Sequence, residues 1–252
     1  MTKDLSYSDY VTDEKFISEY NAYQRKYAAR IRESDRVIVE LVRDIVNKEE
    51  GDKPIRFLDI GCSTGNLLMH LKNMVPGLDL YGGDLAKLSL EACRTNQDLA
   101  GITFQEMNIL KLGVKDFFDI IVVNAVIGIL NDDEMKRAYR SIYSALKPNG
   151  IVIVFDWCHR FEQDLVINEK SRTHPDGLNI YFRPEKTIRE VFNVIGFSVM
   201  QFHPFQVPVD LPQHADKGEL ITYTVKNEAE ERMAFRGILL QPWCHITARK
   251  PV

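Results

Sequence analysis

Two alternating kinds of segment make up the middle of the chain. Short apolar runs, typical of buried strands, are followed by longer runs in which apolar residues recur every three or four positions, as on one face of a helix. The strand-like runs read IRFLDI, LDLYGGD, ITFQEMNI, FFDIIVVNAV and GIVIVFDW. Such alternation predicts βαβ units, and therefore a parallel sheet with helices on both faces. The KPNG sequence (Lys147 to Gly150) predicts a turn between the fourth helix and the fifth strand.

The flanking segments follow other patterns. Residues 13–49 are charged and helical in period, which predicts an N-terminal helical extension. Residues 158–183 are mixed and polar, and they predict a cover over the sheet edge. The remaining C-terminal segments predict, in order, a helix, a strand, a β-hairpin insertion and a final strand: PEKTIREVFNVIG, FSVMQFHPF, ELITYTVKNEAEERMAFRGIL and WCHITARK. Without internal repeats, residues 1–252 are expected to form a single domain.

Composition narrows the class of protein. Hydrophobic residues make up 45% of the 252 residues and charged residues 27%, as in a soluble globular protein. The net charge of −4 and the absence of a Lys/Arg block argue against a nucleic-acid partner. The polar N-terminus and the lack of a membrane-length apolar run predict no membrane span and a cytoplasmic location. The cysteines form no CxxC pair, so neither a metal site nor a disulfide framework is expected: Cys62, Cys93, Cys158 and Cys244.

The first strand-to-helix turn reads DIGCSTG and carries the clearest chemistry. Gly61 and Gly65 allow a ligand to approach the backbone closely. A dinucleotide site would prefer G-x-G-x-x-G and a helix N-terminus free for pyrophosphate. Asp59 instead places a carboxylate near the ligand, which repels pyrophosphate and attracts an ammonium or sulfonium group. This favours S-adenosylmethionine over NAD, although Asp59 could also serve only to bond backbone amides.

The chain resembles the class I S-adenosylmethionine-dependent methyltransferases in four motifs between Ile55 and Trp157. Asp59, Gly61 and Gly65 match the family's first motif, with Ser63 in place of its middle glycine. The motifs that follow are YGGDL, EMNIL and the pair FDIIVVNAVIGIL and LKPNGIVIVFDW. The resemblance implies an α/β fold, a doubly wound, mostly parallel seven-stranded sheet of Rossmann-like type. Residues 1–50 would then be an N-terminal helical lid, 55–157 the cofactor-binding core and 158–252 the acceptor-side insertions.

The resemblance also implies a set of cofactor-binding residues. Asp84, 19 positions after Gly65, would bind the ribose hydroxyls, or it could be the N-cap of the helix that follows. Asn108 and Ile109 would hold the adenine. The other candidates of the core, around the first motif and after the second and fourth strands, are Asp59, Gly61, Cys62, Ser63, Gly65, Asn66, Leu85 and Asn124.

Tyrosines of the N-terminal region form a second group of candidates. Tyr20, Tyr23 and Tyr27 share a helical face, which predicts that at least two of them pack against the sheet. In related small-molecule methyltransferases an N-terminal helix closes over the cofactor, with tyrosine and arginine near its carboxylate, which implies that role for Tyr27 and Arg32. Tyr7 and Tyr10 would be lid residues near the acceptor.

The methyl acceptor should lie above the ends of the fourth and fifth strands. A hydroxyl or amine acceptor would benefit from a general base, for which His159 is the first candidate and His203 the second. A carboxylate or thiolate acceptor would need only a cationic or hydrogen-bonding clamp. Residues that could line the acceptor pocket come from the insertions and the last hairpin: Tyr181, Arg183, Arg236, Trp243 and His245.

Methyl transfer to a small polar molecule is therefore the leading hypothesis. The segment NAVIG lacks the N/D-P-P-Y/F pattern of methyltransferases that act on amides and bases. Residues 222–250 look like the tail of bacterial methyltransferases associated with surface polysaccharides, which implies a sugar or a sugar-linked group. The alternatives are a nicotinamide-dependent oxidoreductase and a non-catalytic S-adenosylmethionine-binding protein. Apolar surface on the N-terminal helices could serve a homodimer.

Overall fold

The computed structural model describes residues 13–48, 53–160, 162, 164–170, 177–207, 221–226, 230, 232–237 and 242–252. Tyr7 and Tyr10 lie outside the described residues, as does the side chain of Arg236.

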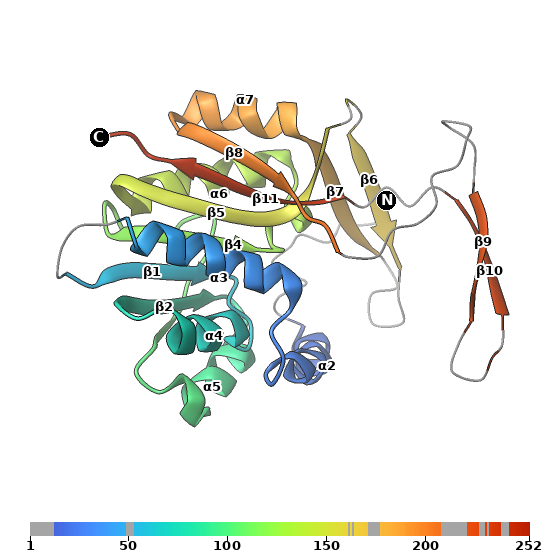
Figure 1. Ribbon diagram of the computed structural model, residues 1–252, viewed down its shortest axis with the longest axis horizontal. Helices are drawn as coiled ribbons and strands as arrows, with labels where there is room; N and C mark the ends of the chain where they lie inside the picture. The colour runs from blue at the N-terminus through green and yellow to red at the C-terminus, as the bar shows by residue number, and fades with distance from the viewer. Residues whose placement is uncertain are drawn as a thin grey trace.

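A large, mostly parallel sheet forms the centre of the molecule (Figure 1). Its strand order is β3-β2-β1-β4-β5-β11-β8, in which β11 runs antiparallel to both of its neighbours. The strands are β1 (Ile55–Ile60), β2 (Leu78–Asp84), β3 (Thr103–Glu106), β4 (Phe118–Asn124), β5 (Leu146–His159), β8 (Ser198–Pro204) and β11 (Trp243–Arg249). The order reverses between β1 and β4, so their carboxyl ends open a crevice. The predicted doubly wound seven-stranded sheet is confirmed.

Two hairpins extend this sheet or lie beside it. β6 (Leu165–Glu169) pairs antiparallel with β7 (Leu178–Pro184), and β7 pairs with the last residues of β5. The polar segment after Asp156 was predicted to cover the sheet edge, whereas its hairpin pairs with the carboxyl end of β5, a strand inside the sheet. β9 (Ile221–Lys226) and β10 (Arg232–Gly237) pair only with each other, as expected for the predicted hairpin insertion.

Helices cover both faces of the sheet because each carries one apolar stripe. On one face, Met135, Tyr139 and Phe192 belong to a core with β4, β5 and β11. On the other, Ile38 and Leu68 belong to a core with β1, β2 and β4. The helices are α2 (Glu14–Gln24), α3 (Glu33–Val46), α4 (Asn66–Met74), α5 (Lys87–Thr95), α6 (Asp132–Ala145) and α7 (Glu185–Ile195). Short 3-10 turns are η1 (Arg25–Tyr27), η2 (Gln97–Leu99) and η3 (Ile127–Ile129).

The KPNG segment differs from its predicted form. α6 ends at Ala145, and β5 already begins at Leu146, so the segment is an irregular start of the strand. Asn149 adopts a left-handed conformation with φ 66°, and its backbone N–H donates to the carbonyl of Lys250. The Lys250 N–H donates in turn to the carbonyl of Gly150. These long-range bonds with the end of the chain hold the segment in the sheet.

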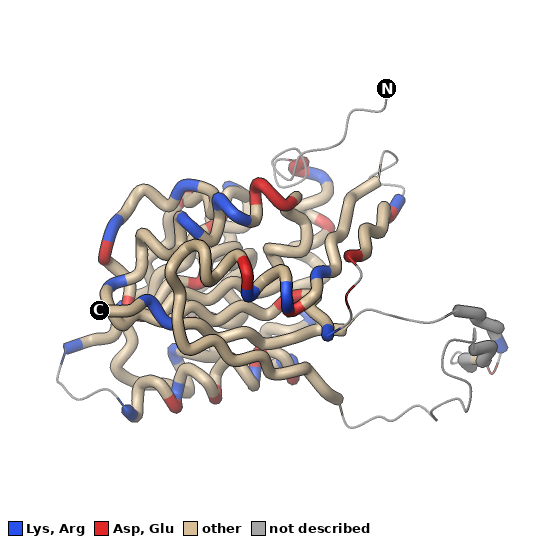
Figure 2. Tube along the Cα trace, turned by 90° about the horizontal axis from the view of Figure 1, so that it is seen from above, with Lys and Arg blue, Asp and Glu red and all other residues tan. Residues whose placement is uncertain are grey.

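Charge is spread over the described surface. Figure 2 shows acidic and basic residues interspersed along the trace. Among the described helices none combines the length and the apolar character that crossing a membrane requires. The described residues also contain no group of three or more His, Cys, Asp or Glu side chains placed to hold a metal ion.

Candidate active site

A cavity of about 380 Å³ opens at the carboxyl ends of the parallel strands. One half is lined by Gly61 and Ser63, which follow β1, and by Asp84 and Asn124, which end β2 and β4. The other half is lined mainly by apolar residues of α2, of the segment after β4, and of β5 and β7: Phe16, Ile17, Val126, Ile129, Trp157, Leu178 and Ile180. The cavity thus joins the predicted cofactor turn to the predicted acceptor side.

The turn after β1 is too tight for ordinary side chains. Gly61 has φ 81° and Gly65 φ 75°, values that favour glycine. A Cβ on Gly61 would lie 2.4 Å from Cγ2 of Val126. Ser63 also adopts a left-handed conformation, with φ 48°, and thereby replaces the family's middle glycine. Its Oγ is buried and makes no hydrogen bond within the described part of the chain, so it can donate to a ligand.

Asp84 ties this turn to the end of β2. One carboxylate oxygen accepts a 2.8 Å hydrogen bond from the backbone N–H of Ser63, and the other accepts one of 2.8 Å from Ala86. α5 begins at Lys87 with Ala86 as its N-cap, so the alternative that Asp84 is the N-cap is wrong. The backbone N–H of Leu85 also donates to this carboxylate, which lines the cavity and retains some acceptor capacity. It can therefore still accept from a ligand diol.

Three carboxyl groups lie close to one another beneath the cavity. Asp59 is 2% exposed, and its Oδ1 has no hydrogen-bond partner among the described residues. Burial is the main cause that raises the pKa of Asp59 to about 8, and the charges of Asp35 and Asp84 contribute to the same shift. Such a group favours a cationic partner, because a cation nearby offsets both burial and like charge.

Asp35 is a member of this cluster that the sequence predictions missed. It lies on α3, is 3% exposed, and has a pKa raised mainly by burial. Its carboxylate accepts a 2.9 Å hydrogen bond from the side-chain amide of Asn124, which lines the cavity. The signal was present in the sequence, since Asp35 shares the helical face of Ile38, Val39 and Val42, all fully buried.

The raised pKa of Asp59 predicts that the protein becomes less stable as the pH increases. Because the folded pKa (about 8) exceeds the unfolded one, the folded state binds the extra proton, and its free energy of unfolding falls between pH 4 and pH 8. The slope from Asp59 alone approaches about 1.4 kcal/mol per pH unit at most. We expect Asp59→Asn to flatten the slope in urea unfolding at pH 5, 6, 7 and 8.

The matched control for this prediction is Asp44→Asn. Asp44 lies exposed on α3, so its removal should leave the slope of the wild-type protein unchanged. An unchanged slope in Asp59→Asn would show that Asp59 titrates normally.

The N-terminal helices contribute to the cavity through a different tyrosine from the predicted one. Tyr20 lines the cavity, and burial raises its pKa. Tyr27 and Arg32 are absent from the described lining; the guanidinium of Arg32 lies 4.3 Å from the ring of Tyr27 and donates to the side chain of Gln24. Tyr23 is 47% exposed, so it does not pack against the sheet. Contacts of Tyr27 and Arg32 with a cofactor stay predictions.

Several predicted cofactor residues lie beside the cavity instead of on its described lining. The side-chain oxygen of Asn108 accepts a hydrogen bond from the backbone N–H of Leu110, and Asn66 donates to the carbonyl of Gln24. Ile109 is buried in the core, and Leu85 packs against it. Their adenine and loop contacts stay predictions.

Cys62 is a buried thiol below the turn. A hydrogen bond with Cys93 and burial raise its pKa well above the usual range, so the thiol is protonated and unreactive at neutral pH. Cys158 and Cys244 are in a similar contact. The cysteines are distant in sequence but paired in space as free thiols.

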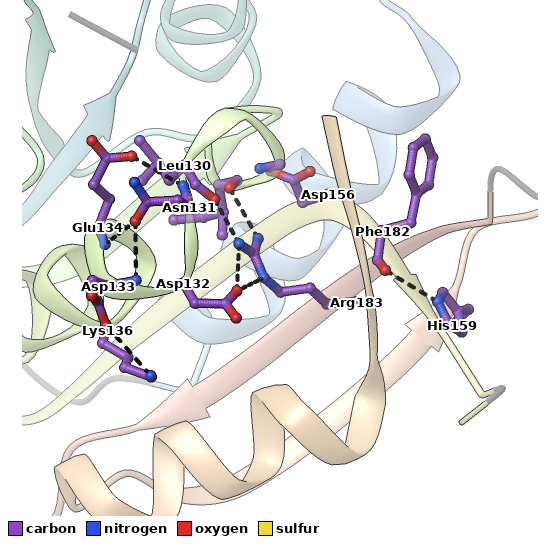
Figure 3. Close-up of polar contacts among 12 residues, drawn as sticks. Leu130, Asn131, Asp132, Asp133, Glu134, Lys136, Asp156, His159, Phe182 and Arg183 are labelled. Carbon is purple, nitrogen blue, oxygen red and sulfur yellow. Dashed lines mark hydrogen bonds and ion pairs between the residues drawn. The ribbon is translucent and has the colours of Figure 1, made fainter. Parts of the chain in front are cut away.

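The two histidines predicted as bases do not line the cavity. His159 is buried at the end of β5, opposite Pro184 of β7, with Nε2 3.4 Å from the carbonyl of Phe182 (Figure 3). His203 is exposed on β8 and pairs in register with His245. Burial lowers the pKa of His245 to about 4, and its Nε2 lies 3.0 Å from the carbonyl of Ser34. Of the described lining residues on the acceptor side, Glu169 is the one that carries a carboxylate.

The guanidinium of Arg183 bonds other groups of the protein. Its guanidinium is buried, forms a 3.0 Å ion pair with Asp132, and donates to the carbonyls of Leu130 and Ile127 (Figure 3). Tyr181 packs against it, with the ring centre 4.8 Å from the guanidinium carbon. The cavity wall is formed instead by Trp157, which directly follows Asp156 at the end of β5. Trp243 lies behind Trp157, at 4.3 Å between ring centroids.

Comparison with known proteins identifies the family to which the strands and helices around the cavity are similar. Residues 57–150 match the family model described as Methyltransferase domain. The chain contains a methyltransferase domain. Its resemblance to the class I S-adenosylmethionine-dependent methyltransferases is thereby confirmed, and the matched range begins within β1 and ends in β5.

Individual relatives of the methyltransferase domain differ in what they methylate. The chain is 26% identical over 113 residues to malonyl-[acyl-carrier protein] O-methyltransferase of Bacillus anthracis, covering 45% of this chain and 41% of that protein. It is 25% identical over 161 residues to the tRNA N(3)-cytidine methyltransferase METTL2B of Homo sapiens, covering 58% and 43%. The chain therefore spans less than half the length of both curated relatives.

A solved structure shows the same fold as the methyltransferase domain and its extensions. The 1,6-didemethyltoxoflavin-N1-methyltransferase of Burkholderia thailandensis, with bound 1,6-didemethyltoxoflavin and S-adenosylhomocysteine, is similar with a TM-score of 0.58 and 14% identity. The likeness covers 94% of this chain and 86% of that one. The resemblance of residues 222–250 to surface-polysaccharide methyltransferases stays a prediction, because the family match ends at residue 150.

Proposed function

We propose that the protein transfers the methyl group of S-adenosylmethionine to a small-molecule acceptor. The observation that carries the proposal is the joint position of the Gly61–Ser63 turn and the Asp84 carboxylate in one cavity, above the buried acid Asp59. Asp84 accepts hydrogen bonds from the ribose hydroxyls, and the acidic cluster favours the cationic methionine end. A nicotinamide dinucleotide fits less well, because its pyrophosphate would meet the same acids.

The protein's part in the reaction is alignment and exclusion of water. The acceptor attacks the methyl carbon, the carbon–sulfur bond breaks, and sulfur keeps the electron pair as a neutral thioether. Phe16 and Tyr20 of α2 cover the cavity and limit the entry of water. A hydroxyl or amine acceptor must also lose a proton. Glu169 supplies an acceptor for it at the cavity, in place of the predicted histidines.

Two features support a small molecule over a nucleic acid. The cavity is bounded on the acceptor side by apolar residues from α2, β5 and β7, which leaves space for a molecule of limited size. The net charge is −4, and acidic and basic residues are mixed along the described chain (Figure 2). Several curated relatives are nevertheless tRNA methyltransferases, so the test includes an RNA arm.

The deciding experiment supplies S-adenosylmethionine with an isotopically labelled methyl group. The protein is incubated with a metabolite extract in one arm and with total tRNA in the other, and labelled products are identified by mass spectrometry. We expect a labelled small molecule and unlabelled tRNA, with no product from Asp84→Ala. Label in tRNA alone would overturn the acceptor class. Binding of S-adenosylhomocysteine without any labelled product would favour a non-catalytic binding protein.

A further inference from the structure

The acceptor half of the cavity has an unusual balance of apolar and polar groups. Val126 and Ile129 after β4, Leu178 and Ile180 on β7, and Phe16 on α2 supply apolar walls. No lysine, arginine or histidine is among the described residues that line the cavity. Arg183, the nearest candidate from the sequence, is held by Asp132 and by two backbone carbonyls. A negatively charged acceptor therefore meets no cationic clamp.

Trp157 is held in a fixed orientation at this wall. Its ring lies 4.3 Å from that of Trp243 and 5.2 Å from that of Phe182, measured between centroids. Gly128 closes the remaining side, because a Cβ there would lie 2.3 Å from a carbon of the indole ring. A rotation of the side chain would clash with these neighbours, so the position of its N–H is set by packing.

The indole N–H of Trp157 is a buried donor that the described residues leave without a hydrogen-bond partner. Buried donors without partners are rare and cost free energy, so such a group at a cavity points to a partner supplied by a ligand. The side chain lines the same cavity as the turn after β1. The side chain that carries this donor therefore forms part of the cavity wall near the turn after β1.

We propose that the methyl acceptor is an uncharged molecule with an apolar body that presents a carbonyl or hydroxyl oxygen to the indole N–H of Trp157. The proposal rests on the proposed function and narrows its acceptor class. A free sugar is disfavoured because a polyol needs many polar partners, and these walls provide few. A carboxylate is disfavoured because the described residues of the walls provide no cation.

Nuclear magnetic resonance of the indole N–H groups tests the proposal directly. The chain has two tryptophans, and the signal absent from Trp157→Phe identifies that of Trp157. Protein saturated with S-adenosylhomocysteine is titrated with acetophenone, ethylbenzene, benzoate and methyl α-D-glucopyranoside. We expect acetophenone to bind and to move the Trp157 signal downfield, and ethylbenzene to bind without that downfield shift. Benzoate and the glucoside should bind at least roughly tenfold more weakly than acetophenone.

The Trp157→Phe variant provides the matched comparison. In the wild type, a neutral hydrogen bond should make acetophenone bind roughly fivefold to tenfold more tightly than ethylbenzene. The variant should lose this preference. Calorimetric binding of S-adenosylhomocysteine shows whether this variant is folded. If the variant is unfolded, the titration of the wild-type protein alone tests the proposal.

Three results would overturn the proposal. The first is that the glucoside or benzoate binds more tightly than acetophenone. The second is that acetophenone binds without moving the Trp157 signal. The third is that folded Trp157→Phe keeps the wild-type preference for the ketone. Failure of the proposed function is a separate result, because it appears as absent binding of S-adenosylhomocysteine. The same four probes are then titrated into the free protein, where the same comparisons decide what the cavity accepts.

Discussion

Replacing Asp84 by alanine is expected to weaken the binding of S-adenosylhomocysteine at least about 100-fold, from the loss of two hydrogen bonds to a charged acceptor at about 1.5 kcal/mol each. The carboxylate also accepts from the backbone N–H groups of Ser63 and Ala86. Its removal therefore takes away the partner of the ribose and loosens the turn on which the cofactor lies. Isothermal titration calorimetry measures both affinity and enthalpy.

Two further variants separate recognition from general damage. Asp84→Asn keeps one acceptor oxygen for the backbone, so its affinity should lie between those of the wild type and Asp84→Ala. Asp79→Ala changes an acid at the opposite end of the same strand, where it accepts from the hydroxyl of Tyr81. Its affinity should match the wild type. Equal affinity of Asp84→Ala and wild type would remove Asp84 from the cofactor site.

The second large effect concerns stability. We expect Arg183→Met to lower the free energy of unfolding by roughly 3 kcal/mol, because two buried backbone carbonyls lose a charged donor at roughly 1.5 kcal/mol each. Arg183 has 4% of its side chain exposed and satisfies Asp132 and two backbone carbonyls. Its charge also lowers the pKa of Asp156, which burial raises to about 6. Without the guanidinium, Asp156 should become harder to ionise.

Urea unfolding at pH 7 measures this loss, with Arg140→Met as the control. Arg140 is exposed on α6, so its replacement should change the free energy of unfolding by no more than about 0.5 kcal/mol. If Arg183→Met keeps wild-type stability while the affinity for an acceptor falls, then Arg183 belongs to the acceptor pocket, as the sequence suggested.

The cofactor half of the cavity was the part most accessible to prediction. Gly61, Ser63 and Gly65 lie in one local turn, and Asp84 ends the next strand, so short-range geometry places them together once the strands are parallel. Asp35 was not predicted, although it lies on the buried face of α3. The apolar periodicity identifies the buried face of the helix but does not indicate that an acid on that face is buried as well.

The acceptor half depends on contacts between segments far apart in the chain. His159 was predicted to face the acceptor because it lies beyond the fifth strand, and Arg183 because it lies in an insertion. The β6–β7 hairpin pairs with the end of β5, and both side chains are buried. Trp157 is exposed to the cavity instead, since Trp243 and Phe182 hold its ring. The local sequence does not specify which of several neighbouring polar or aromatic side chains will line the cavity, because packing between distant segments decides this.

By itself, the sequence determined the alternating α/β pattern and the turn of Asp59, Gly61 and Gly65. These follow from periodicity and backbone conformation over a few residues. The tertiary structure decided the burial that raises the pKa of Asp59, the loss of the histidines from the cavity and the place of Trp157 in the cavity wall. Burial and side-chain direction are properties of neighbours brought together by folding, so only the assembled sheet and its hairpin could set them.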